Sequence, residues 1–95
     1  MRTNKKDSSN RRVKPKINIY PIKEILEELE RAAQIHPYWP NRMLESVSII
    51  TEEMGELAKA ANDYVLFGHD KEKSKTEAIQ LAAMAIRFLM NFEKY

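Results

Sequence analysis

Residues 43–65, MLESVSIITEEMGELAKAANDYV, decide the fold. Apolar side chains recur along this stretch at intervals of three and four residues, at Met43, Leu44, Val47, Ile50, Met54, Leu57, Ala61, Tyr64 and Val65. A helix completes a turn about every 3.6 residues, so this spacing places the apolar residues on one face for about seven turns. The stretch therefore predicts a long amphipathic helix that begins near Pro40 or Asn41 and ends at Gly68.

A shorter helix precedes the long one. Residues 22–35 carry apolar side chains at helical spacing, and Pro21 suits the first turn because the N–H that it lacks has no partner there. The stretch His36-Pro37-Tyr38-Trp39-Pro40 does not continue this helix, since each proline removes a backbone donor and restricts the residue before it. Residues 36–40 therefore predict a stiff connector between two helices.

A third helix follows the long one. Residues 69–75 predict a charged turn, after which a helix runs from about Lys75 to about Phe92, with Ser74 or Thr76 as its cap. Apolar side chains cover most of the circumference of this helix. Such a helix is usually central in a bundle or lies at a subunit interface.

Length and composition limit the classes of protein. A 95-residue chain forms one domain and buries only about 60 to 65% of its unfolded surface, so a lone three-helix core is marginal. We therefore expect an all-α fold, in which a three-helix protomer is completed into a helical bundle by dimerisation, as a homodimer or a dimer of dimers. The absence of cysteine and of any apolar run of about 18 residues favours a cytoplasmic protein without a membrane contact.

Charge is unevenly distributed along the chain. Residues 1–16 hold seven basic side chains and one acidic one, a net charge of +6, whereas residues 17–95 hold nine basic and thirteen acidic ones, a net charge of −4. We predict a disordered basic tail over residues 1–16 and a single all-α domain over residues 17–95. A nucleic-acid or membrane-surface contact by the tail is the weaker alternative, because no aromatic residues are interleaved with its basic ones.

Acidic side chains lie at helical spacing in the two C-terminal helices. Glu53 and Glu56 are three residues apart, so their carboxylates lie about one turn apart on neighbouring positions. Glu77 on the next helix reaches the same point if the two helices pack antiparallel. Hard oxygen ligands of this kind suit Mg²⁺ or Mn²⁺ better than zinc. The spacing is compatible with an acidic metal pocket, and also with ordinary exposed glutamates on amphipathic helices.

The helical period gives these residues different positions relative to the core. At about 100° per residue, Glu53 falls about 60° to one side of the apolar stripe and Glu56 about 60° further, while Glu52 points toward solvent. The third helix carries one polar strip, formed by Glu77, Gln80 and Arg87. A carboxylate buried on this strip requires a cation or a basic partner, because burying it unpaired costs several kcal/mol.

These acidic residues carry a family resemblance. Residues 52–56, Glu-Glu-Met-Gly-Glu, followed by residues 77–80, Glu-Ala-Ile-Gln, resemble the EExxE, spacer, ExxD signature of the MazG-like, all-α nucleoside triphosphate pyrophosphohydrolases. The stretches at residues 36–40 and 80–85 are similar to the small single-domain members of that family, including ones found in phages. The resemblance covers residues 29–90. It implies a dimeric helical bundle that binds Mg²⁺ and hydrolyses a nucleotide between its α and β phosphates, to a monophosphate and pyrophosphate.

The resemblance assigns roles to the acidic residues. Carried over by position, the metal ligands are Glu53, Glu56 and Glu77, with Gln80 where the family has Asp. An amide ligates through its carbonyl oxygen but adds no negative charge, so a second metal is less favoured here. Glu52 or Glu53 is the candidate general base that orients the attacking water.

Four residues are candidates for contact with the nucleotide. Lys59 and Arg87 are candidates for phosphate contacts, with exposed surface cations as the alternative. Trp39 is the only tryptophan and is a candidate for stacking on a base, with a hydrophobic lid on the bundle end as the alternative. His36 is a candidate for a base or sugar contact, although the helix dipole alone favours a histidine at a helix C-terminus. Core positions are predicted for Met43, Met54, Met84 and Met90.

Two other classes of protein compete with this assignment. A ferritin-like di-iron bundle requires Glu-x-x-His pairs, which neither His36 nor His69 forms. The stronger rival is a catalytically weak or silent helical dimer that acts as a nucleotide- or partner-binding module. Gln80 and the basic tail support that alternative.

Overall fold

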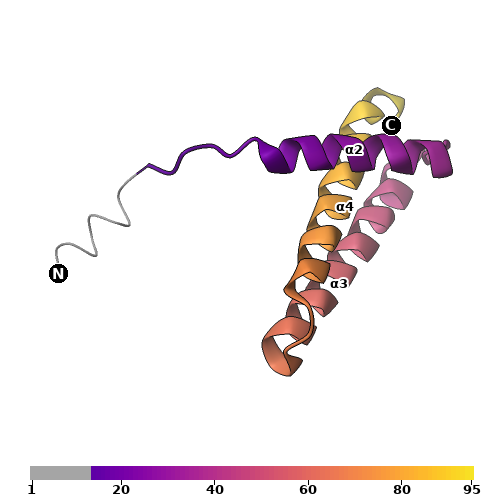
Figure 1. Cartoon of the computed structure of the whole chain (residues 1–95). Coiled ribbons are helices and arrows are strands. Elements are labelled where there is room, and N and C mark those ends of the chain that lie inside the picture. Colours follow the sequence, from indigo (N-terminus) through magenta and orange to yellow (C-terminus); the bar gives the residue numbers. More distant parts are fainter. Residues whose placement is uncertain (1–13) are drawn as a thin grey trace, which may run out of the picture.

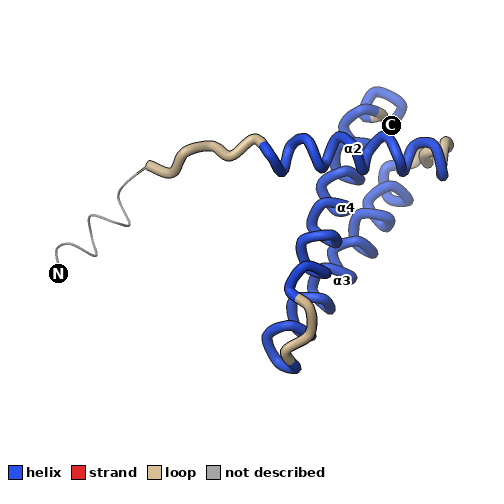
Figure 2. The backbone as a smooth tube through the Cα atoms, viewed as in Figure 1, coloured by secondary structure: helices blue, strands red, loops and turns tan. Residues whose placement is uncertain are grey.

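The computed structural model describes residues 14–95, and over these residues the protein is all-helical (Figure 2). In chain order the elements are α2 (Tyr20–Ile35), α3 (Met43–Phe67), α4 (Lys71–Met90) and the short 3₁₀ helix η1 (Phe92–Lys94). α3 and α4 form an antiparallel hairpin, and α2 crosses the open end of that hairpin (Figure 1). α4 packs against both of the other helices. The predicted all-α protomer of three helices is confirmed.

The first two predicted helices end where predicted, and α3 begins at Met43, two or three residues after the predicted start. Pro21 lies in the first turn of α2, and that helix ends where the His36 N–H donates to the Ala32 carbonyl at 2.8 Å. α3 ends at Gly68, whose φ of 69° is the left-handed conformation that glycine adopts without a Cβ penalty. The His69 N–H then donates to the Asp63 carbonyl at 3.1 Å, which satisfies a carbonyl at the helix end.

The predicted start of the third helix is wrong. α4 begins at Lys71, so most of the charged stretch over residues 69–75 is the first turn of a helix. Asp70 caps it, because its carboxylate accepts from the Glu72 N–H at 2.9 Å. The hydroxyls of Ser74 and Thr76, the predicted caps, donate instead to carbonyls of the preceding turn.

The buried interior of the protomer is small. The fully buried apolar residues among residues 14–95 are Ala32, Ala60 and Ala83, and buried with them are Ser46, Glu77 and Arg87. Alanine and serine allow helices to approach closely but bury little apolar area, so they contribute little hydrophobic free energy. The protomer therefore leaves much of its apolar surface uncovered.

The predicted core face of α3 is only partly covered. α4 packs on the side of α3 that carries Ser46, Glu53 and Ala60, which are spaced by seven residues. Met43 and Met54, predicted as core, are 41% and 52% exposed, and Met90 on α4 is 69% exposed. The prediction of a buried position is wrong for these three methionines within the protomer. Met43 and Met54 lie instead on an open apolar face of α3, and Met90 lines a cavity near the end of α4.

Two further sequence predictions concern the basic N-terminal tail and the absence of a membrane-spanning helix. Residues 1–13 of the predicted basic tail lie outside the described residues, and the remaining three, residues 14–16, are exposed and non-helical. Among residues 14–95, none of the helices combines the length and the apolar composition that a membrane crossing requires.

Candidate functional site

Each of the three helices carries a glutamate on the face that packs in the protomer. Glu77 on α4 is buried, with 6% of its surface exposed, although its neighbours Thr76 and Ala78 are exposed. The Glu28 side chain on α2 is 14% exposed, and Glu53 on α3 is partly buried. Acidic residues are usually exposed unless a partner compensates their charge. Three shielded carboxylates on three helices therefore indicate a site rather than a solvated surface.

A groove of about 540 Å³ lies between α2, the connector, α3 and α4. Its polar lining includes Glu28 from α2, Gln80 from α4 and two carboxylates from α3. Of the predicted site residues, the groove brings together Glu52, Glu53, Gln80, His36, Trp39 and Arg87. The groove thus brings candidate metal ligands and candidate base contacts of the sequence analysis onto one concave surface.

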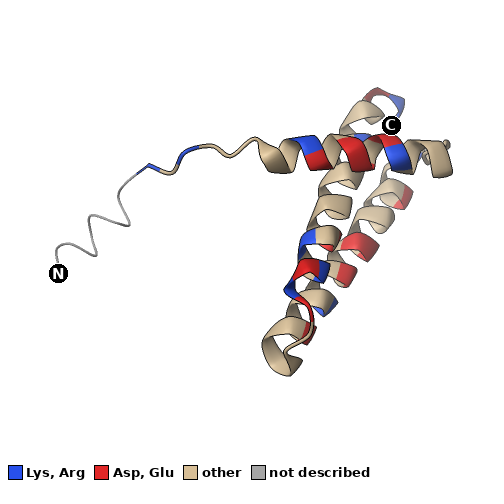
Figure 3. Cartoon of the chain, in the orientation of Figure 1, with Lys and Arg blue, Asp and Glu red and all other residues tan. Residues whose placement is uncertain are grey.

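Glu53 lies in the field of the surrounding carboxylates. Burial raises its pKa above the ordinary value, and the negative charges of Glu77, Glu56, Glu28 and Glu52 raise it further. These neighbours come from all three helices (Figure 3). No basic side chain within residues 14–95 forms an ion pair with Glu53 to offset the repulsion. The excess negative charge at Glu53 is therefore available to a cation.

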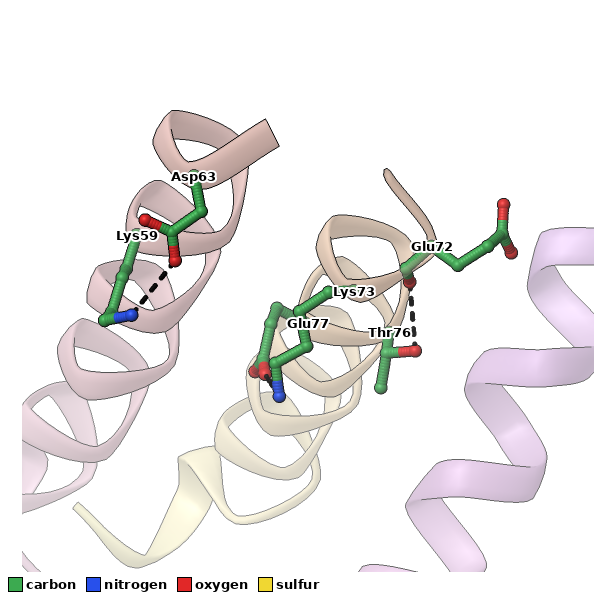
Figure 4. Close-up of polar contacts among 6 residues, drawn as sticks. All are labelled: Lys59, Asp63, Glu72, Lys73, Thr76 and Glu77. Atoms are coloured by element: carbon green, nitrogen blue, oxygen red, sulfur yellow. Dashed lines mark hydrogen bonds and ion pairs between the residues drawn. The ribbon is translucent and has the colours of Figure 1, made fainter. Parts of the chain in front are cut away.

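The other two shielded glutamates have basic partners. The Lys73 ammonium lies 2.9 Å from the Glu77 carboxylate, on the side of α4 that faces α3 (Figure 4). The hydrogen bond to Glu77 and its negative charge raise the pKa of Lys73. Glu28 accepts two hydrogen bonds from the Arg31 guanidinium, at 2.8 and 2.7 Å. These pairs neutralise the carboxylates that flank Glu53.

With these pairings the described side chains do not form a closed metal cage. Within residues 14–95 no three histidine, aspartate or glutamate side chains are placed to share one ion. The donor set nevertheless fits Mg²⁺ or Mn²⁺, because every candidate ligand around Glu53 is an oxygen and Glu53 carries unneutralised charge. The Lys73 side chain is 65% exposed, so it can rotate into solvent and release Glu77.

Glu52, Glu56 and Lys59 lie on the outer side of α3. Glu52 is exposed, as its helical position predicts, and it lines the edge of the groove. Glu56 is also exposed and lies outside the groove, on an adjoining hollow shared with Glu52, Glu53 and Lys59. Lys59 pairs with Asp63 at 3.0 Å (Figure 4). The structure therefore separates Glu56 and Lys59 from the residues of the groove itself.

Arg87 is buried rather than a solvated cation. Its Nη2 donates to the His36 carbonyl at 2.9 Å, and its guanidinium lies 5.0 Å from the centre of the Trp39 ring, a cation–π contact. Burial lowers the pKa of Arg87, and within residues 14–95 no carboxylate pairs with it. A buried guanidinium that uses one donor in this way retains donors for an anion.

The connector supplies the other two predicted nucleotide contacts. Trp39 is partly buried, and its indole N–H donates to the Tyr95 hydroxyl at 2.6 Å. His36 is exposed and caps α2, so its backbone makes the contacts with Ala32 and Arg87 while its imidazole is left at the groove. Both residues line the groove with Arg87.

Sequence reasoning missed three residues of this region. Glu28 lies among Ile25, Leu29 and Ala32 on the packed face of α2, and an acidic residue within an apolar stripe is the signal that identifies it. Lys73 was assigned to a turn, where it has no helical relation to Glu77. Tyr95 contacts Trp39 across 56 positions of sequence, a contact that no local pattern indicates.

Comparison with known proteins adds no relative: the chain matches no protein-family model, no curated protein and no solved structure.

The position of Glu53 predicts a pH-dependent stability. Because the folded state raises the pKa of Glu53, its charge destabilises the fold above that pKa, and the penalty disappears as the pH falls below the ordinary value. In metal-free buffer at pH 7, Glu53→Gln should raise the unfolding free energy by about 0.2–0.5 kcal/mol for each like-charge contact removed. Urea unfolding at pH 7 and at about pH 4 measures this difference, which should close at the lower pH.

Glu45→Gln provides the control, because Glu45 is an exposed glutamate of the same helix that pairs only with Arg42, at 3.8 Å. It should not raise the unfolding free energy at pH 7, because Glu45 lies in the first turn of α3, where a negative charge is favourable. A Glu53→Gln protein less stable than the wild type at pH 7 would contradict the description of Glu53.

Proposed function

We propose that the protein is a Mg²⁺-dependent nucleoside triphosphate pyrophosphohydrolase of the MazG-like type, cleaving between the α and β phosphates to release a monophosphate and pyrophosphate. One observation carries the proposal: shielded carboxylates from three helices converge around Glu53, beside a groove that also holds Arg87 and Trp39. The sequence signature at residues 52–56 and 77–80 supports the same function. Cytoplasm is the proposed compartment, because the substrate is a cytoplasmic nucleotide.

The residues that would hold the metal are Glu53, Glu56 and Glu77, with the Gln80 carbonyl oxygen as a further donor. Glu28 on α2 adds negative charge near Glu53, while both of its carboxylate oxygens accept from Arg31. When bound, Mg²⁺ neutralises phosphate charge and acidifies water. Glu77 becomes available to it when Lys73 turns toward solvent.

Protein side chains supply the proton transfer and the positioning. Glu53 or Glu52 accepts the proton of the attacking water, and the raised pKa of Glu53 makes its carboxylate a better proton acceptor. As the water oxygen bonds to phosphorus, the anhydride bond between the α and β phosphates breaks and its electrons pass to the departing oxygen. Phosphoryl chemistry of this kind depends mainly on positioning and on charge neutralisation.

The nucleotide would lie along the groove. Arg87 faces the groove without a carboxylate partner among residues 14–95, so it suits a phosphate oxygen. Trp39 presents a ring on which a base stacks, and His36 lies beside it for a base or sugar contact. Lys59 lies on the adjoining hollow next to Glu56, where it reaches only the solvent end of a phosphate chain.

A second copy of the chain would complete the fold. The open apolar face of α3 includes Met43, Val47, Met54 and Val65, each at least 40% exposed. Uncovered apolar surface on this scale marks an association site, and a bundle of two protomers buries it. We therefore propose a homodimer or a dimer of dimers.

One observation favours the second candidate, a silent helical dimer that binds a nucleotide or a protein partner. The Lys73 ammonium lies 2.9 Å from the Glu77 carboxylate and forms an ion pair that can be purely structural. Gln80 gives the site one negative charge fewer than the Asp of the resembled signature. If this candidate is right, no nucleotide is turned over and Mg²⁺ does not change the melting temperature.

The enzyme proposal predicts Mg²⁺-dependent release of pyrophosphate from one or more members of a panel of canonical and modified nucleoside triphosphates. Glu53→Gln and Glu56→Gln should each lower kcat/KM by more than about 100-fold, because the loss of a metal ligand exceeds the effect of losing a residue that only orients one. Neither variant should melt at a lower temperature than the wild type, because each removes a charge from a repulsive cluster. Glu45→Gln, on the same helix and outside the groove, should retain full activity; equal losses in all three variants would contradict the site.

The proposed association predicts a mass above that of one chain in sedimentation analysis. Met54→Lys places a charge on the open apolar face and should shift the population toward the monomer, because an unpaired charge at an interface costs several kcal/mol. Ser48→Lys is the matched control: Ser48 is exposed on the opposite side of α3 and bonds only to the Leu44 carbonyl. A monomeric wild-type protein would contradict the proposal.

A further inference from the structure

Trp39 and Arg87 line two cavities of the protomer. Both residues line the groove of about 540 Å³ that carries the acidic residues, and both also line a second cavity of about 730 Å³. The second cavity lies between α2, the connector and the C-terminal end of α4, and Leu29 and Met90 contribute to its lining. A shift of the Trp39 ring therefore changes the shape of both cavities at once.

A chain of hydrogen bonds fixes the edge of the Trp39 ring. The indole N–H donates to the Tyr95 hydroxyl at 2.6 Å, and that hydroxyl donates to Ser46 Oγ at 2.7 Å. Ser46 is fully buried, and its own hydroxyl donates to the Arg42 carbonyl at 3.1 Å. Every hydroxyl in the chain both donates and accepts, so the ring is tied to the first turn of α3.

The Tyr95 ring is itself held by aromatic neighbours. Its centre lies 5.2 Å from that of Phe88 on α4 and 6.3 Å from that of Phe92 on η1, both within the range of favourable aromatic pairs. These contacts involve the ring and leave the hydroxyl for Trp39 and Ser46. The removal of the hydroxyl alone therefore spares the packing of the ring and breaks the hydrogen bonds to Trp39 and Ser46.

We propose that Tyr95 is a positioning residue for nucleotide binding. Its hydroxyl, which is anchored on Ser46, accepts from the indole N–H and holds the Trp39 ring in the orientation that the nucleotide meets. The inference rests on the proposed function, since it takes Trp39 as a nucleotide contact. Tyr95 itself lines neither the acidic groove nor the second cavity, so it acts only through Trp39.

Because Trp39 is the only tryptophan, its fluorescence reports its position directly. In Tyr95→Phe, the emission of Trp39 should shift to longer wavelength and quenching by acrylamide should rise, since the indole loses its hydrogen bond and gains mobility. Ser46→Ala, which removes the acceptor of the Tyr95 hydroxyl together with the Ser46 bond to the Arg42 carbonyl, should change both readouts in the same direction. Tyr20→Phe is the matched control, because Tyr20 is 74% exposed at the start of α2, and it should change neither.

The second arm measures the nucleotide. Tyr95→Phe should raise KM by between about 2- and 10-fold, the range of a single hydrogen bond, with kcat close to the wild-type value. A lower melting temperature with unchanged Trp39 fluorescence would show that Tyr95 only stabilises the fold and would overturn the proposal. Changed Trp39 fluorescence with an unchanged KM would overturn it as well. If the wild-type protein neither turns over nor binds any nucleotide, the proposed function fails and the binding role of Tyr95 fails with it. Fluorescence would still decide whether Tyr95 orients the ring.

Discussion

Repulsion among carboxylates that lie on packed helix faces is the constraint on which the rest of this structure depends. Glu28, Glu53 and Glu77 occupy positions where a helical bundle normally places apolar side chains. Burial raises the pKa of Glu53, and the charges of the neighbouring glutamates raise it further. Lys73 and Arg31 neutralise two of them, and Glu53 keeps its unpaired charge. An unpaired carboxylate in such a position lowers stability, and this cost is the physical basis of the metal-dependent function proposed above.

The buried interior matches this interpretation. Its apolar residues are alanines, which bring α3 and α2 close to α4 without much hydrophobic gain, while large side chains such as Met54 remain on an open face. A protomer built in this way leaves unneutralised charge at Glu53 and leaves its apolar face uncovered. Arg87 links the connector to α4 through a hydrogen bond to the His36 carbonyl and a cation–π contact with the Trp39 ring.

Local patterns predicted most of the fold and only part of the site. Pro21 and Gly68 set helix ends through backbone chemistry that acts within a few residues, so those ends were predictable. The start of α4 was missed because Asp70 competes with Ser74 as a cap, and that error concealed the i, i+4 pair of Lys73 and Glu77. Glu28 joins the site because α2 crosses the hairpin, and Tyr95 joins it because the C-terminal segment folds back. Neither tertiary arrangement is predictable from the spacing of residues in the sequence.

The central proposal is that a divalent cation offsets the repulsion at Glu53, and counting bound Mn²⁺ by electron paramagnetic resonance tests it most directly. The account predicts at least one tightly bound ion per chain in the wild-type protein. Binding should weaken strongly in Glu53→Gln, Glu56→Gln and Glu77→Gln alike, because each removes a proposed metal ligand, and should be unchanged in Glu45→Gln. Wild-type binding that persists in all three variants, or no binding at all, would contradict the account.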